Sequence, residues 1–352
     1  DGRILYRFPD ELPSSDSSIW AIAVDPGSGK PMGPPARLAN VAPDSNDFRA
    51  SADGKRFTYV SMRSSDAVYV GNLKLGAKAF NPKPLTLDEW NSSPSDWTRD
   101  SKAVLYYSIR SGRSVILKQR IDQQTPEILL SGAESYRWPV LSPTGDRLLY
   151  TAATTADRND PSKRLMSMPM DGGASSVLLK GGHYTYQCGS VPSARCVASE
   201  IQGQQLVFSI LDPVEGKGAE IHRVQAPAEG ELLWSLSPDG NTIAITDPAT
   251  GGEVRILTLA DRKVVTLPLQ GWKWDQMQSV AWSADGGHLF GTAWSGTSTA
   301  LLFIDLRGNL QVLADAPTNE AWLYNPVASP DGRYLAFMKR TFESNVMMLE
   351  HF

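Results

Sequence analysis

One tight turn recurs along the chain at nearly even spacing. The stretch NPVASPDGRYLAFMK, residues 325–339, holds two apolar runs separated by Ser-Pro-Asp-Gly. Copies of this turn, some degenerate, have their fourth position at Gly2, Gly54, Ser101, Gly145, Ala194, Gly240, Gly286 and Gly332. The gaps between these positions are 52, 47, 44, 49, 46, 46 and 46 residues. An internal period of this length is typical of repeat architectures, β-propellers among them.

Each repeat predicts four short strands. An apolar run leads into the turn, and a second run follows it. After a loop comes a third, alternating run, such as AVYVGNL, LLFIDL or NVMML, and after a polar turn a fourth. Alternation with period two indicates sheets that pack on another layer, and no window has a sustained helical period. We therefore predict an all-β fold, a β-propeller of four-stranded antiparallel blades, with residues 1–352 as a single domain.

The ends of the chain bear on the number of blades. The first repeat lacks its innermost strand, and the last stops at SNVMMLEHF, before an outermost strand. A short upstream stretch could supply both strands and close the ring. The chain also starts at Asp1, in the middle of a motif, so we expect it to come from a longer protein. We expect eight blades, with seven as the alternative if the first repeat is not a blade of its own.

The composition of the chain limits the classes of partner that it could bind. The chain has 34 Lys and Arg against 38 Asp and Glu, and no block of like charges. This argues against binding nucleic acid, which usually needs a basic face. No apolar stretch approaches the roughly 18 residues of a membrane helix. We therefore expect contact with a membrane only through a missing upstream segment.

The repeats resemble those of TolB-like propellers. A closer resemblance is to the C-terminal propellers of bacterial, especially acidobacterial, membrane proteins that carry an N-terminal serine/threonine kinase or winged-helix domain. It rests on SDSSIWAIAVDPGSGKPMGPPARLAN, SADGKRFTYV, CGSVPSARCVASE, LVFSILDPVEGKGAEI and SNVMMLEHF, and covers essentially the whole chain. It implies a sensory or interaction module in the periplasm, with no catalytic residue to transfer. The turns TRDS and VPSA depart from the pattern, which leaves their shape open.

No set of residues indicates a reaction. The four histidines, His183, His222, His288 and His351, lie in different repeats, and no nucleophile elbow occurs. Of these, His183 lies in a loop where it could touch a ligand. The stretch DPGSGKPMG lacks the residues of a phosphate loop and is expected to be a turn. We therefore predict no enzyme activity, no metal and no cofactor.

The two cysteines, Cys188 and Cys196, flank the turn of the most degenerate repeat, on strands that should pair. Opposed positions on antiparallel strands can meet the geometry of a disulfide. Closing so short a loop would contribute roughly 2–3 kcal/mol in the chain-entropy model. We predict a disulfide here, which requires an oxidising compartment; two small buried thiols are the alternative.

Aromatic residues gather in the loops that lead into the blades. Large amphipathic rings on loops around a central opening suit a recognition surface, although some of them could instead cap the layers between blades. The loop Lys339–Ser344 is expected on the same face. The predicted binding residues are Trp90, Tyr136, Trp138, Tyr184, Trp272, Trp274, Trp322 and Tyr324.

Three functions remain open. The one we favour is a non-catalytic sensory module of a larger bacterial signalling protein, which binds a small molecule or a protein on the aromatic face. The first alternative is a lyase or hydrolase that uses the central channel. It needs convergent acids on the innermost strands, where Asp47 and Asp96 are the candidates. The second alternative is a structural scaffold that docks one partner protein.

Overall fold

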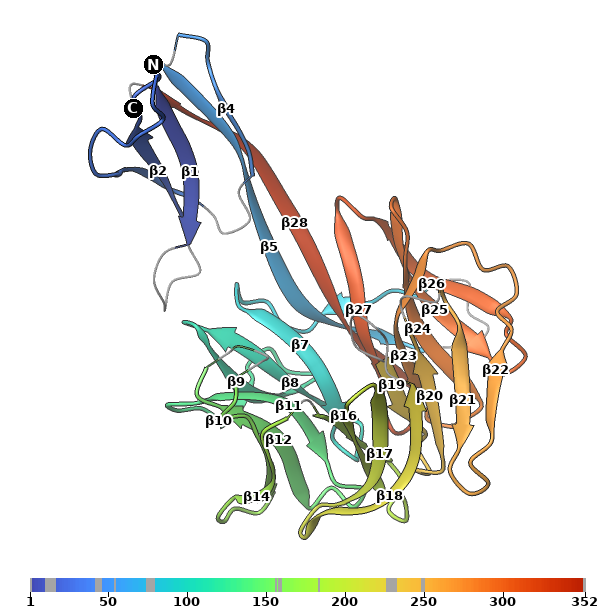
Figure 1. Cartoon of the computed structure of the whole chain (residues 1–352). Helices are drawn as coiled ribbons and strands as arrows, with labels where there is room; N and C mark the ends of the chain where they lie inside the picture. The colour runs from blue at the N-terminus through green and yellow to red at the C-terminus, as the bar shows by residue number, and fades with distance from the viewer. Residues whose placement is uncertain are drawn as a thin grey trace. The chain divides into compact units, whose positions relative to one another are not determined.

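The computed structural model describes residues 2–9, 17–41, 46–53, 55–73, 80–155, 157, 160–182, 184–225, 233–247 and 251–350. These residues form strands and connecting turns and contain no helix, which confirms the all-β class (Figure 1). The chain falls into two compact units. Unit 1 comprises Asp1–Ser65 with Thr341–Phe352, and unit 2 comprises Asp66–Arg340. The single domain over residues 1–352 stays a prediction.

Unit 2 contains five antiparallel sheets of four strands, each in chain order. Their strands are β7 (Asn91–Trp97), β8 (Ala103–Arg110), β9 (Arg113–Arg120) and β10 (Glu127–Leu130); β11 (Ser135–Leu141), β12 (Arg147–Ala153), β13 (Arg164–Pro169) and β14 (Ser176–Lys180); β15 (Tyr184–Cys188), β16 (Cys196–Gln202), β17 (Gln205–Asp212) and β18 (Gly216–Gln225); β19 (Leu233–Leu236), β20 (Thr242–Thr246), β21 (Val254–Thr258) and β22 (Val264–Leu267); and β23 (Gln276–Trp282), β24 (His288–Trp294), β25 (Ser298–Asp305) and β26 (Leu310–Pro317). These are the four-stranded blades that the repeat predicts.

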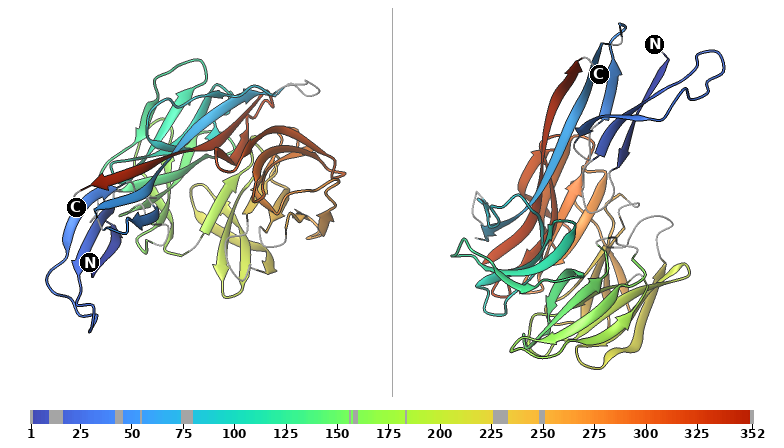
Figure 2. Two further views of the ribbon diagram at one scale, coloured as in Figure 1. Left: turned by 90° about the horizontal axis from the view of Figure 1, so that it is seen from above. Right: turned by 90° about the vertical axis from the view of Figure 1, so that its left-hand side faces the viewer.

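A sixth sheet combines the two ends of the chain. Its order is β27 (Ala321–Ala328), β28 (Tyr334–Glu350), β5 (Arg56–Asn72) and β4 (Asn46–Ala50), and the short β6 (Lys83–Pro84) also pairs with β5. Figure 1 and both views of Figure 2 show β5 and β28 side by side along their length. In unit 1, β1 (Arg3–Pro9), β2 (Ser17–Ala23) and β3 (Ala36–Val41) form a further sheet.

The innermost strands of unit 2 contact one another in a closed cycle, in the order β7, β11, β15, β19, β23, β27 and back to β7. Side chains fix these neighbours. The indole of Trp97 donates to the Val327 carbonyl at 2.9 Å, and that of Trp282 to the Ser235 carbonyl at 3.0 Å. The described residues thus close a ring of six sheets in unit 2, and the predicted count of eight or seven blades is not confirmed.

The recurrent turns follow one design. In the last copy, the Gly332 N–H donates to the Ser329 carbonyl at 2.9 Å, and the Ser329 hydroxyl donates to Asp331 at 2.7 Å. Gly332 has a φ of 69°, which glycine adopts at little cost. Ser101, which replaces glycine in TRDS, takes the same conformation with a φ of 60°. In VPSA the Ala194 N–H still donates to the Val191 carbonyl, at 2.9 Å, so both departures from the pattern keep a turn.

The loops expected between the second and third strands of two repeats are absent. Residues 61–65 lie inside β5, and the predicted loop Lys339–Ser344 lies inside β28. That placement of the loop on the aromatic face is therefore wrong. Long-range pairing overrides the local tendency to turn here, because β5 and β28 form an antiparallel ladder with each other.

Candidate ligand- and partner-binding site

The structure distributes the eight predicted aromatic residues over a range of exposure. Trp90 and Trp138 are exposed, at 40% and 37%. Tyr136, Trp272, Trp322 and Tyr324 are half-buried. Tyr184 and Trp274 are buried. The residues therefore differ in how much of each ring is exposed, and whether each of them binds a ligand stays a prediction.

Trp272 and Trp274 belong to the packing of their sheet. Their rings meet edge to face, with centroids 5.5 Å apart, and Trp274 lies in the same apolar cluster as Met277. A Cβ at Gly252 would come within 2.4 Å of the Trp272 ring, so the absence of a side chain at Gly252 makes room for that ring. This pair caps the core between β21 and β23 more than it presents a surface.

Trp322 and Tyr324 form a second edge-to-face pair, with centroids 6.1 Å apart, on β27. The Trp322 indole donates to the Thr318 carbonyl at 2.8 Å. Burial raises the pKa of the Tyr324 hydroxyl, and its neighbours Arg340 and Asp66 act in opposite directions. These rings are tied to their own loop and strand.

Tyr184 and Tyr136 pack inward. Burial raises the pKa of Tyr184 well above its ordinary value, and the Lys163 ammonium lies 4.9 Å from its ring centroid. Tyr136 meets Tyr150 edge to face at 5.9 Å. The neighbouring His183 lies outside the described residues.

Trp138 differs from the other aromatic residues in its backbone. It has a φ of 56°, at a bulge of β11 where the register shifts between Arg137 and Val140. This left-handed conformation costs a bulky residue about 1–2 kcal/mol. The buried Tyr186 hydroxyl donates to the Trp138 carbonyl at 2.6 Å and so stabilises the conformation. Strained residues of this kind gather at functional sites.

Two further residues, Tyr107 and Arg137, lie beside Trp138 and Tyr186. We call these four residues the Trp138 cluster. The Tyr107 ring meets the Trp138 ring edge to face at 4.9 Å, from the neighbouring sheet. The Arg137 guanidinium lies 5.6 Å from the Tyr107 ring centroid, and its Nε donates to the Ser114 hydroxyl at 2.7 Å. The cluster thus combines an exposed indole with a fixed cation, which suits an aromatic, planar or anionic group.

Tyr107 was missed from the sequence because it lies in the middle of a second strand, where the pattern predicts packing. It is 9% exposed, which agrees with that pattern. Only the neighbourhood of β8 and β11 across two sheets brings its ring to Trp138. No local signal in the sequence could have identified this contact.

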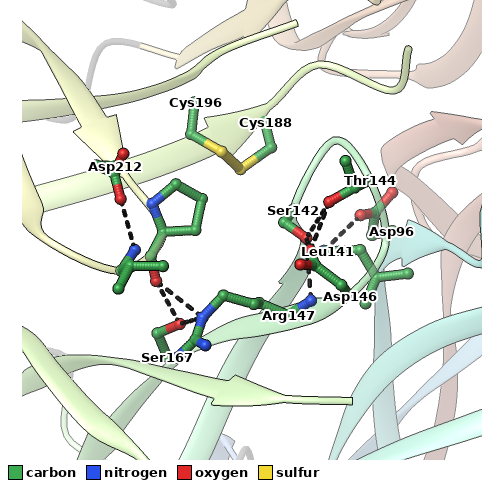
Figure 3. The surroundings of a disulfide bond; sticks show 12 residues. Asp96, Leu141, Ser142, Thr144, Asp146, Arg147, Ser167, Cys188, Cys196 and Asp212 are labelled. Atoms are coloured by element: carbon green, nitrogen blue, oxygen red, sulfur yellow. Dashed lines mark hydrogen bonds between the residues drawn. A yellow bond between two sulfur atoms is a disulfide. The ribbon is translucent and has the colours of Figure 1, made fainter. Parts of the chain in front are cut away.

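Cys188 and Cys196 face each other on β15 and β16, and their sulfur atoms are bonded (Figure 3). The turn between them is closed by the Gly189 N–H, which donates to the Arg195 carbonyl at 3.0 Å. The disulfide therefore spans the base of the VPSA turn. Its oxidation state in the protein stays a prediction.

The two candidate acids of the central channel, Asp96 and Asp47, have different surroundings. Asp96 accepts a hydrogen bond from the backbone N–H of Leu141 at 2.8 Å (Figure 3). It also accepts one from the Trp97 N–H at 2.8 Å and lies 3.4 Å from Arg99. It thereby ties β7 to β11. Asp47 is exposed on β4, in unit 1. Among the residues that the structure describes, no group of three or more His, Cys, Asp or Glu could hold a metal ion.

No protein-family model matches the chain. An uncharacterised protein of Agrobacterium fabrum is 28% identical over 187 residues, which span 51% of this chain and 60% of that protein. The match thus covers less than two thirds of that relative. Within the described residues, no helix is both long and apolar enough to cross a bilayer.

Comparison with solved structures identifies the fold. A protein of Agrobacterium tumefaciens assigned as TolB has a TM-score of 0.58 at 14% identity and covers 79% of this chain and 99% of its own. TolB from Acinetobacter baumannii has a TM-score of 0.51 at 16% identity and covers 90% of this chain and 80% of its own. The fold is a TolB-like β-propeller. At these identities the likeness shows the fold alone, and the closer resemblance to kinase sensor propellers is not confirmed.

Propeller enzymes are also similar to the chain. They include a puromycin hydrolase, with a TM-score of 0.49 at 15% identity over 95% of this chain and 56% of its own, and an oligogalacturonate lyase in complex with manganese, with a TM-score of 0.47 at 14% identity over 77% of each chain. Our prediction that the chain is not an enzyme is therefore wrong as drawn, because proteins of similar fold catalyse reactions. These similarities assign no reaction to this chain.

Proposed function

We propose that this TolB-like propeller is a binding module that recognises a protein partner through the Trp138 cluster. One observation carries the proposal: Trp138 is held exposed in a strained backbone conformation, between Tyr107 and the hydrogen bond from Tyr186. Exposed indoles beside a guanidinium are typical of the central residues of protein interfaces.

The setting of the module is part of the proposal. The disulfide at Cys188–Cys196 supports an oxidising compartment, which in bacteria is the periplasm. The resemblance to sensor propellers of acidobacterial kinases and winged-helix regulators supports a role in signalling. We therefore assign the chain to the extracytoplasmic side of a larger signalling protein.

Site-specific photocrosslinking in cells tests the proposal. A benzophenone amino acid replaces Trp138 in one variant and, as the matched control, Val265 in another. Val265 is 50% exposed on β22, the outermost strand of its sheet. We expect a discrete protein adduct from position 138, absent from position 265 and reduced by the additional substitution Arg137→Ala. Equal labelling at both positions, or no adduct at position 138, would contradict the proposal.

A further inference from the structure

Two residues at the same place in their repeats share an unusual backbone. Trp138 comes four positions before Ser142, the serine that opens its turn, and precedes a proline. Asn325 stands in the same relation to Ser329 and also precedes a proline. Their φ angles are 56° and 49°, although the residue before a proline is normally extended. β11 and β27 thus hold these two residues in the same left-handed conformation.

A row of contacts crosses β7 between these two residues. In the ring of unit 2, β7 contacts both β11 and β27. The Asn325 side-chain N–H donates to the Ser93 hydroxyl on β7 at 3.1 Å. Ser93 lies opposite Tyr107 in the ladder of β7 and β8, and the centroids of the Tyr107 and Trp138 rings are 4.9 Å apart. Asn325 is therefore connected to the Trp138 cluster through one serine and one ring.

The Asn325 amide has the capacity for further hydrogen bonds. Its side chain is half-buried, and within the described residues the hydrogen bond to Ser93 is the one that it makes. An asparagine amide has two N–H donors and a carbonyl oxygen that accepts hydrogen bonds. The second N–H and the carbonyl oxygen are therefore available to a bound molecule.

The strand between these two residues carries a polar group without a partner. β7 bulges at Ser95, where its register with β8 shifts between Pro94 and Asp96. The Ser95 hydroxyl is buried and, in the described part of the chain, has no hydrogen-bond partner. Buried side-chain hydroxyls normally have a partner, so an exception of this kind needs one from outside the chain. Ser95 thus adds a second polar group, on β7, to the amide on β27.

The chemistry of this row indicates an extended protein segment. An indole ring packs against apolar side chains, whereas an amide matches the N–H and C=O groups of a peptide bond. In a helix these main-chain groups bond to one another, but in an extended segment they are available to a receptor. An extended segment can therefore place a side chain on Trp138 and its main chain against Asn325 at the same time.

We propose that Asn325 belongs to the recognition site and hydrogen-bonds the main chain of an extended segment of the partner protein. An apolar side chain of the same segment lies on the Trp138 ring. This inference rests on the proposed function, because it takes the ligand to be a protein that binds at Trp138. The competing explanation is that Asn325 only closes the ring of sheets through its contact with Ser93.

Photocrosslinking from both ends of the row is the first test. The benzophenone amino acid replaces Trp138 in one variant and Asn325 in another, and Val265 is again the exposed control position. We expect positions 138 and 325 to label the same protein in cells. Mass spectrometry of the two adducts should map both to one short stretch of that protein, and position 265 should not label it.

Binding of that stretch then separates recognition from ring closure. A synthetic peptide of the mapped stretch is titrated into the full chain, and tryptophan fluorescence gives its Kd. Asn325→Gly keeps the left-handed backbone and removes the amide, so we expect the Kd to rise roughly tenfold, the effect of one lost hydrogen bond. Ser93→Ala removes the same internal hydrogen bond but keeps the amide, so the Kd should change less than about twofold. As the matched control, Gln278→Ala removes an amide at the bulge of β23 and should leave the Kd unchanged.

The outcomes distinguish this inference from the proposed function. An adduct at position 138 with none at 325, or with a different protein at 325, overturns the inference and leaves the proposed function standing. No adduct at position 138 overturns both. Equal rises in Kd for Asn325→Gly and Ser93→Ala would show that Asn325 acts only through ring closure, which also overturns the inference. Urea unfolding of each variant, with a single cooperative transition, confirms that the titrated protein is folded.

Discussion

At the scale of single residues, the proposed function depends most on Trp138. Its φ of 56° is a conformation that glycine adopts freely and that a Cβ disfavours. In an ordinary strand, glycine is less stable than alanine, by about 0.5–1 kcal/mol. At position 138 this order should be inverted, because alanine keeps the strain whereas glycine removes it.

We predict that Trp138→Gly is more stable than Trp138→Ala by about 1 kcal/mol. The free energy of unfolding in urea measures the difference. Tyr136, two residues away and without a positive φ, serves as the control position, where Ala should be the more stable of the pair. If alanine were the more stable residue at position 138 as well, no strain is stored there, and the argument for the cluster fails.

At the scale of elements, the recurrent turn depends on ionised carboxylates. Hydrogen bonds from the Ser142 and Thr144 hydroxyls hold the pKa of Asp146 below its usual range. The pKa values of Asp100 and Asp285 are lowered in the same way, first by hydrogen bonds from Thr98 and Ser283. A carboxylate with a lowered folded pKa adds stability above its unfolded pKa of about 3.9. That contribution is lost as the pH falls through the folded value.

The protein should therefore lose stability on acidification below about pH 4. We expect Asp146→Asn to unfold more easily than the natural protein at pH 7 and to lose less stability between pH 7 and pH 2.5. Ser142→Ala should act in the same direction, since it removes a donor to the carboxylate. Urea titrations across this pH range measure both effects. Parallel loss of stability in all three proteins would show that the turn carboxylates do not contribute.

The same elements show which structural features can be predicted from the sequence and which cannot. The turn, the run of four strands and the facing positions of Cys188 and Cys196 follow from local pattern, and the structure has them. The straight course of β5 does not follow, because residues 62–65 resemble other inter-strand segments and their conformation depends on β28, far along the chain. The strain at Trp138 and its contact with Tyr107 likewise need the bulge in β11 and the packing of two sheets.

At the scale of the molecule, the fold of unit 2 depends on how its ring of sheets closes. A sheet of four strands has two faces to bury, and a ring buries both against neighbours. In the described part of unit 2 the last sheet meets the first through β27 and β7. There the Asn325 side chain donates to the Ser93 hydroxyl at 3.1 Å, across 232 positions of sequence. This contact, with the one between Trp97 and Val327, defines the closure.

A disulfide across this closure tests the central claim most directly. Ser93→Cys with Asn325→Cys should form an intrachain disulfide on mild oxidation of the folded protein. Because it closes so long a loop, it should stabilise the oxidised form by up to about 5 kcal/mol over the reduced form in the chain-entropy model. Thiols that stay free in the folded protein would place β27 and β7 apart and contradict the closed ring.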